Sequence, residues 1–205
     1  MRVRYQSYQS FGLSPILVLI IINLLVYIVI FIVSKIAPQL ALILISVLGL
    51  PPPDYFLAQP WTIVTCMFLH IEFWHIFANM ITLYFFGTYF SRLVGERKFL
   101  FVYFVGGILG NIFLLLLARF YPYNIALGAS GAVFALAGAL VVMRPKLPVI
   151  IFPIPAPIPL WVAVIGGFLI LSFLPHIAWQ AHLGGLVLGL ITGYIFRKRE
   201  RDFFF

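Results

Sequence analysis

Long stretches without a charged residue constrain this sequence more than any other feature. The residues from Phe11 to Val33 include no Asp, Glu, Lys or Arg, and similar stretches recur toward the C-terminus. A helix crosses the ~30 Å hydrocarbon core of a bilayer with about 20 mostly apolar residues. Stretches of this length and composition therefore predict that the chain places several helices in a membrane.

The composition supports the same class of protein. Of the 205 residues, 64% are hydrophobic and 9% are charged, whereas soluble domains are about half apolar and a quarter charged. The single cysteine, Cys66, excludes an intramolecular disulfide and a thiolate metal cluster. We expect no metal and no cofactor. The net charge of +8 does not indicate a nucleic-acid partner here, because its distribution fits a membrane topology.

The apolar stretches predict an all-α membrane protein with a single domain over residues 1–205. One further apolar stretch, Leu40 to Leu50, is too short to cross a bilayer and is followed by three prolines, so it predicts an interfacial or re-entrant loop between the first two spans. Six membrane-spanning helices are predicted, at about residues 11–34, 73–91, 99–118, 128–143, 160–174 and 181–196.

The positions of the basic residues predict the orientation of these spans. Basic residues favour the cytoplasmic side of a membrane, and six spans with both termini cytoplasmic leave only Lys35 and Arg119 on the outer side. The C-terminal basic residues then act as a topology signal with some attraction to anionic lipids. The cytoplasmic set consists of Arg2, Arg4, Arg92, Arg97, Lys98, Arg144, Lys146, Arg197, Lys198, Arg199 and Arg201.

Polar residues inside apolar helices are candidates for function, because they are costly in a bilayer. Ser130 lies 14 residues before Arg144, Asn79 lies 13 before Arg92, and His182 lies 15 before Arg197. At about 1.5 Å of helical rise per residue, all three side chains are expected at one depth, roughly 20 Å from the cytoplasmic charges. His75 lies one helical turn before Asn79 on the same face.

Small residues predict which of these helices approach closely. Gly185, Gly189 and Gly193 recur at every fourth position of the last span, and the fourth span is rich in glycine and alanine. Such a series allows two helix backbones to come near each other. The series is compatible with a homodimer face, but we favour packing inside the molecule, where it would bring Ser130 close to His182.

The residue types at this depth predict nucleophilic chemistry. A serine hydroxyl becomes a useful nucleophile when a neighbouring base accepts its proton, and histidine suits this task near neutral pH. Ser130 is therefore the candidate nucleophile and His182 the candidate base. His75, Asn79 and the backbone N–H of Ser130 are candidate donors to the oxyanion that forms during attack. Because no Asp or Glu lies within these spans, a dyad is expected.

Three motifs give the chain a family resemblance. Gly128-Ala129-Ser130-Gly131 is similar to the G-x-S-G nucleophile motif of the rhomboid intramembrane serine proteases. The stretch from His70 to Asn79 is similar to their H-x4-H-x3-N segment. The stretch from Ala181 through Gly185 to Gly189 is similar to their A-H-x-x-G-x-x-x-G pattern. Together the motifs extend over roughly residues 61–197.

The resemblance carries expectations for fold, site and substrate. It implies a six-helix rhomboid-like bundle of the minimal prokaryotic form, in the plasma membrane, with residues 37–60 as the membrane-embedded loop. It assigns Ser130 as nucleophile, His182 as base, and His75 and Asn79 to the oxyanion site. It also implies that the fifth span and residues 176–180 gate the entry of single-span membrane proteins, which are cleaved near the outer face.

Two other histidines have simpler interpretations. We interpret His70 as a structural residue that hydrogen-bonds a loop backbone, and His176 as a loop residue without a role. The pattern His70-x-Glu-x-x-His75 is not the H-E-x-x-H zinc motif, because histidines five residues apart diverge by about 140° around a helix.

Three functions remain open at this point. The leading one is an intramembrane serine endopeptidase. The alternative is a catalytically silent rhomboid-like protein that binds or routes single-span clients. The third is a small channel or transporter that uses the polar residues as a solute site, which the absence of an inverted repeat between the two halves of the chain disfavours.

Overall fold

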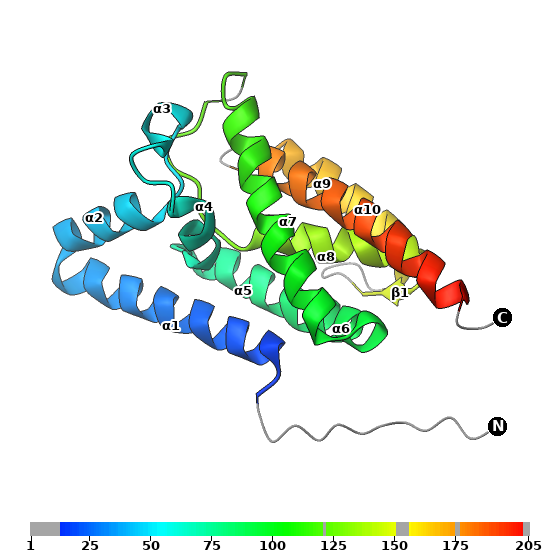
Figure 1. The fold of residues 1–205 in the computed structure, drawn as a ribbon. Helices are drawn as coiled ribbons and strands as arrows, with labels where there is room; N and C mark the ends of the chain where they lie inside the picture. The colour runs from blue at the N-terminus through cyan, green and yellow to red at the C-terminus, as the bar shows by residue number, and fades with distance from the viewer. Residues whose placement is uncertain (1–12, 121, 151–155, 175–176, 203–205) are drawn as a thin grey trace.

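The chain folds into a bundle of helices. The computed structural model describes residues 13–120, 122–150, 156–174 and 177–202. In Figure 1, α7 crosses in front of α8, α1 and α2 form an arm on one side, and α9 lies beside α10. The helices are α1 (Pro15–Ile36), α2 (Pro38–Leu48), α3 (Pro53–Phe56), α4 (Thr62–Thr65), η1 (Cys66–Phe68), α5 (Phe73–Thr82), η2 (Leu83–Gly87), α6 (Thr88–Val94), α7 (Glu96–Leu117), α8 (Ser130–Met143), α9 (Leu160–Ser172) and α10 (Trp179–Asp202).

Local sequence explains where several helices begin and end. Ser14 caps α1 by accepting a hydrogen bond from the backbone N–H of Leu17 at 3.4 Å, and Pro15 occupies the first helical position, where no N–H is needed. Gly95 separates α6 from α7 with a φ of 88°, a left-handed conformation that glycine adopts without strain. The turn at Gly95 reverses the chain, so that α7 packs against α6 and, farther along, against α4.

The core of the molecule is formed by α7, α8 and α10. Ten of the 14 residues of α8 are buried, including Leu136 and Leu140, which are fully inaccessible to solvent. On α7, Phe99 and Tyr103 are fully buried. A hydrophobic helix that is covered on all sides occupies the centre of a bundle. This central position of α8 holds its first residue, Ser130, in a fixed place.

The chain before α5 is tied to the loop before α8. Leu50 and Ala126 exchange two backbone hydrogen bonds, at 2.8 and 2.9 Å. The predicted short segment after the first span is present as the 11-residue helix α2, and the indole N–H of Trp61 donates to the backbone carbonyl of Val47 at its end. These bonds hold the segment of residues 37–60 against the loop before α8 and against Trp61.

The helical membrane architecture predicted from the sequence is confirmed, but six spans are not. Within the described residues, three helices are long and apolar enough to cross a bilayer: Pro15–Ile36, Glu96–Leu117 and Trp179–Arg197. The pair Thr62–Phe68 and Phe73–Val94, bent by 94°, would make four. With 14 residues in α8 and 13 in α9, these helices are about 20 Å long and shorter than the hydrocarbon core.

Helix boundaries differ from the predicted spans at several ends. The helix of the fourth predicted span, α8, begins at Ser130 and not at residue 128, because Gly128 has a positive φ that no α-helix accommodates. The proline-rich connection after α8 forms a short antiparallel pair of strands, β1 (Pro148–Val149) and β2 (Ile158–Pro159), within the described residues. The predicted start of the first span at residue 11, the basic residues Arg2 and Arg4, and His176 lie outside the described residues.

Candidate active site

Ser130 is the first residue of α8, at the end of a loop with special backbone geometry. Gly128 has a φ of 117°, and a Cβ placed on it would lie 2.6 Å from Nε2 of His75. A residue with a side chain would therefore be strained in its backbone and would also displace the histidine ring. The glycine at position 128 lets the loop turn into the helix while His75 packs directly against the backbone.

The structure brings Ser130 and His182 into direct contact. Nε2 of His182 lies 2.8 Å from Oγ of Ser130, which is hydrogen-bond distance. His182 is 5% exposed, and its Nδ1 has no hydrogen-bond partner among the described residues. When the hydroxyl donates to Nε2, the neutral ring carries its proton on Nδ1. The pair has the geometry of a serine nucleophile and its base.

The contact between Ser130 and His182 follows from the very close approach of α8 and α10. A Cβ on Gly185 would overlap the backbone carbonyl of Gly131, and one on Gly189 would overlap that of Ala135. Gly193 faces Ala139 in the same way. The three contacts repeat at every fourth residue of both helices, so the small residues pack inside the molecule, as the sequence analysis favoured.

An aromatic residue that the sequence analysis did not identify holds the ring of His182. The ring of Phe134 lies 4.5 Å from that of His182, with an angle of 23° between their planes. Phe134 is one helical turn after Ser130, so both side chains project from the same face of α8. This i, i+4 spacing was the available signal. Stacking restrains the imidazole on one face where a carboxylate would otherwise orient it.

His70 and His75 lie together beside the loop that precedes Ser130. Their ring centroids are 4.9 Å apart, and Nε2 of His70 accepts a hydrogen bond from the backbone N–H of Ala129 at 3.4 Å. The structure thus gives His70 the loop-binding contact that the sequence analysis expected. The side-chain amide of Asn79 donates to the backbone carbonyl of His75 at 2.9 Å.

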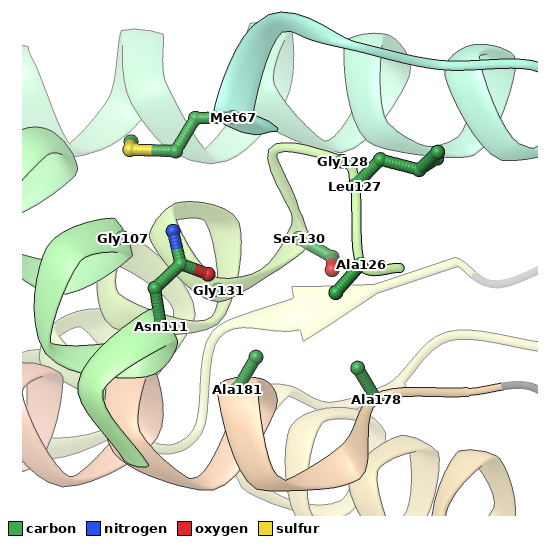
Figure 2. Close-up of a pocket in the computed structure, with 10 residues that line it drawn as sticks. All are labelled: Met67, Gly107, Asn111, Ala126, Leu127, Gly128, Ser130, Gly131, Ala178 and Ala181. Atoms are coloured by element: carbon green, nitrogen blue, oxygen red, sulfur yellow. The ribbon is translucent and has the colours of Figure 1, made fainter. Parts of the chain in front are cut away.

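A small cavity opens beside Ser130. Its volume is about 20 Å³, and Figure 2 shows it between the loop of residues 126–131, α7 and the start of α10. A space of this size with polar groups in its wall can hold one water molecule. Asn111, which the sequence analysis did not identify, lies in the wall and donates to the backbone carbonyl of Ile63 at 2.8 Å and to Sγ of Cys66 at 3.0 Å.

Tyr123 fixes the start of the segment of residues 122–129 that leads to Ser130. Its hydroxyl donates to the backbone carbonyl of Pro51 at 2.8 Å. The hydroxyl is protonated at physiological pH, and burial raises its pKa further above its ordinary value. Together with the bridge between Leu50 and Ala126, this bond ties the loop that precedes Ser130 to residues 50 and 51.

A family described as "Rhomboid domain" matches residues 57–199. The chain is 32% identical over 154 residues to "Rhomboid protein 1, mitochondrial" of Saccharomyces cerevisiae, a match that covers 67% of this chain and 42% of that protein. It is also 32% identical over 147 residues to "RHOMBOID-like protein 1" of Arabidopsis thaliana, covering 72% of this chain and 37% of that protein.

A third relative has a name that refers to activity. "Inactive RHOMBOID-like protein 8" of Arabidopsis thaliana is 34% identical over 80 residues, which is 39% of this chain and 22% of that protein. The chain spans less than half the length of all three relatives. These relatives come from yeast and a plant, so they give no support to the predicted prokaryotic plasma membrane.

The matched region, residues 57–199, contains Ser130, His182 and each of the three motifs. It covers well over half of the chain, and the helical architecture is the one expected of such a protein. On these grounds the chain belongs to the rhomboid family of integral membrane proteins.

Proposed function

We propose that this protein is an intramembrane serine endopeptidase that uses Ser130 and His182. The observation that carries the proposal is the 2.8 Å distance between Oγ of Ser130 and Nε2 of His182, two residues from helices far apart in the sequence. Membership of a family that consists mostly of serine proteases supports the same function.

The proposed reaction begins with attack by Ser130. His182 Nε2 accepts the proton from the hydroxyl while Oγ bonds to the carbonyl carbon of the scissile peptide. The protonated ring then gives the proton to the leaving amine, and an acyl-enzyme remains on Ser130. A water molecule, deprotonated in turn by His182, releases the acyl group and restores the hydroxyl. The cavity beside Ser130 provides space for such a water.

Several groups are positioned to stabilise the oxyanion. The backbone N–H of Ser130 belongs to the first turn of α8, where N–H groups have no partner within the helix and the helix dipole favours negative charge. His75, which packs against Gly128, and Asn79 complete the proposed set of donors. The N–H of Ala129 is excluded from this set because it donates to His70.

The substrates are proposed to be membrane proteins with a single span, cleaved near the outer face. Six spans with both termini on the cytoplasmic side remain the topology that we propose from the distribution of Lys and Arg. In this topology Ser130 starts α8 below the outer surface, and a short α8 leaves the loop of residues 122–129 to line the approach to it.

Cleavage of a single-span reporter in proteoliposomes tests the proposal. We expect wild type to cleave, and Ser130→Ala and His182→Ala each to lose activity by at least ~10³-fold, because nucleophile and base act as a unit. Ser46→Ala is the matched control, since Ser46 is an exposed serine that only donates to the carbonyl of Ile43. Equal cleavage by wild type and Ser130→Ala would refute the proposal.

The alternative function is a catalytically silent rhomboid-like protein that binds or routes single-span clients. One relative has a name that describes it as inactive. Retained reporter binding with no cleavage by wild type would establish it. The hydrogen-bonded pair of Ser130 and His182 favours the protease.

A further inference from the structure

A second aromatic ring extends the stack on His182 to α9. Phe168 contacts Phe134 edge to face, with centroids 6.1 Å apart and an interplanar angle of 78°. Phe134 in turn stacks on His182 at 4.5 Å. Three rings from three helices, α9, α8 and α10, therefore form one continuous contact that ends at the proposed base.

The remaining packing of α9 makes this contact important. The buried residues of α9 are Leu160, Ala163 and Val164, all within its first turns. Gly166 and Gly167 follow, and no atom lies within 4 Å of a Cβ built on either residue. Beyond them Leu169, Ile170 and Phe173 are exposed, so Phe168 is the side chain that packs the outer half of α9 against the core.

Phe134 is the member through which α9 acts on His182. It is the one residue between Gly131 and Leu140 that is not fully buried, and it contacts Phe168 edge to face. The same ring is stacked on the imidazole of His182. Removing Phe168 leaves Phe134 free to tilt away, and the histidine then loses the restraint that keeps Nε2 directed at Ser130.

We propose that Phe168 is a positioning residue for the protease, acting through Phe134 to hold the ring of His182 in line with Ser130. The proposal rests on the proposed function. Because the outer half of α9 has few other contacts, the position of this helix is coupled to the alignment of the base: displacement of α9 loosens the stack and lowers the reactivity of Ser130.

The test is the rate at which a small fluorophosphonate labels purified protein, since this reagent reaches Ser130 without a protein substrate passing α9. Phe168→Ala is expected to slow labelling by about 2- to 10-fold, the range of one aromatic pair. Reporter cleavage is expected to lose the same factor in kcat with little change in KM. Phe168→Tyr, which keeps the ring, is expected to retain the wild-type rate.

Leu169→Ala is the matched control, because Leu169 is the neighbouring residue and is 52% exposed. It should label like wild type. Coupling is measured in a Phe134→Ala background, where Phe168→Ala should cause no further loss. Thermal unfolding in detergent reports whether each variant is folded, and Phe168→Leu, which keeps most of the volume, replaces Phe168→Ala if that variant does not fold.

Three results would overturn the inference. They are a wild-type labelling rate in Phe168→Ala, or in Phe168→Leu where it replaces that variant, an equal loss in Leu169→Ala, or a full additional loss in the Phe134→Ala background. Failure of the proposed function has a different signature, since wild type itself would then show no labelling that depends on Ser130.

Discussion

Two of the helices that contact α8, α10 and α9, pack against it in opposite ways. On one side α10 approaches so closely that a methyl group on Gly185 or Gly189 would overlap the backbone of α8. By contrast, α9 touches the bundle with its first turns and with Phe168, and the space around Gly166 and Gly167 is open. Both helices carry glycines, but the glycines of α10 are required by packing and those of α9 are not.

The contrast separates two demands on the site. Ser130 and His182 come from α8 and α10, and a hydrogen bond of 2.8 Å between them requires two backbones with little freedom. The proposed function adds a second demand, because a protein substrate would have to reach the same pair from the bilayer. A loosely packed α9 beside the tightly packed pair of α8 and α10 would give way at low cost, and its return to Phe134 would restore the proposed alignment of His182.

Among substitutions in the contact between α8 and α10, Gly185→Ala is expected to have the largest effect on stability and on labelling of Ser130. Its methyl group would overlap the carbonyl of Gly131, one residue from the nucleophile, and the helices have to separate. Overpacking of this kind destabilises a fold by about 1–3 kcal/mol. We also expect Ser130 labelling to fall by more than about tenfold, because the hydrogen bond to His182 lengthens. Thermal unfolding and labelling rates measure the two effects, and unchanged values for both would contradict the close approach.

Gly193→Ala sharpens the comparison along the same interface. Gly193 faces Ala139, more than two helical turns from the dyad. We expect a loss of stability similar to that of Gly185→Ala, about 1–3 kcal/mol, but a smaller loss of labelling. If labelling fell equally in both variants, α8 and α10 would move as one rigid unit. The expectation that overpacking affects Ser130 more strongly when it lies near the dyad would then be wrong.

Gly166→Ala and Gly167→Ala are expected to have the smallest effects. A Cβ at either position meets no atom within 4 Å, and alanine favours a helix over glycine by about 1 kcal/mol. We therefore predict a slightly higher unfolding temperature and an unchanged rate of labelling at Ser130. A destabilisation comparable to that of Gly185→Ala would show that α9 is packed as tightly as α10.

The sequence was most informative where one periodic pattern determined the structure. The Gly185, Gly189 and Gly193 series predicted the close approach of two helices, and the depth of Ser130 and His182 predicted that they could meet. Phe134 was missed although its i, i+4 spacing from Ser130 puts it on the same face of α8; that its ring stacks on His182 depends in addition on how α8 and α10 are positioned, which helix periodicity does not specify. Phe168 was missed for the same reason, since it depends on where α9 lies.

The span count shows another limit of sequence reasoning. Hydropathy located every long helix, but α8 and α9 have 14 and 13 residues and do not by length alone establish six crossings. Their ends depend on local backbone geometry at Gly128 and on the prolines before Leu160, which average hydropathy does not resolve.

The most direct test of the central claim is to identify the residue that a fluorophosphonate modifies. Peptide mass spectrometry of labelled protein is predicted to find the adduct on Ser130 in wild type and in Ser46→Ala, and to find none in Ser130→Ala or His182→Ala. An adduct on another residue, or labelling of Ser130→Ala at the wild-type level, would contradict a dyad of Ser130 and His182.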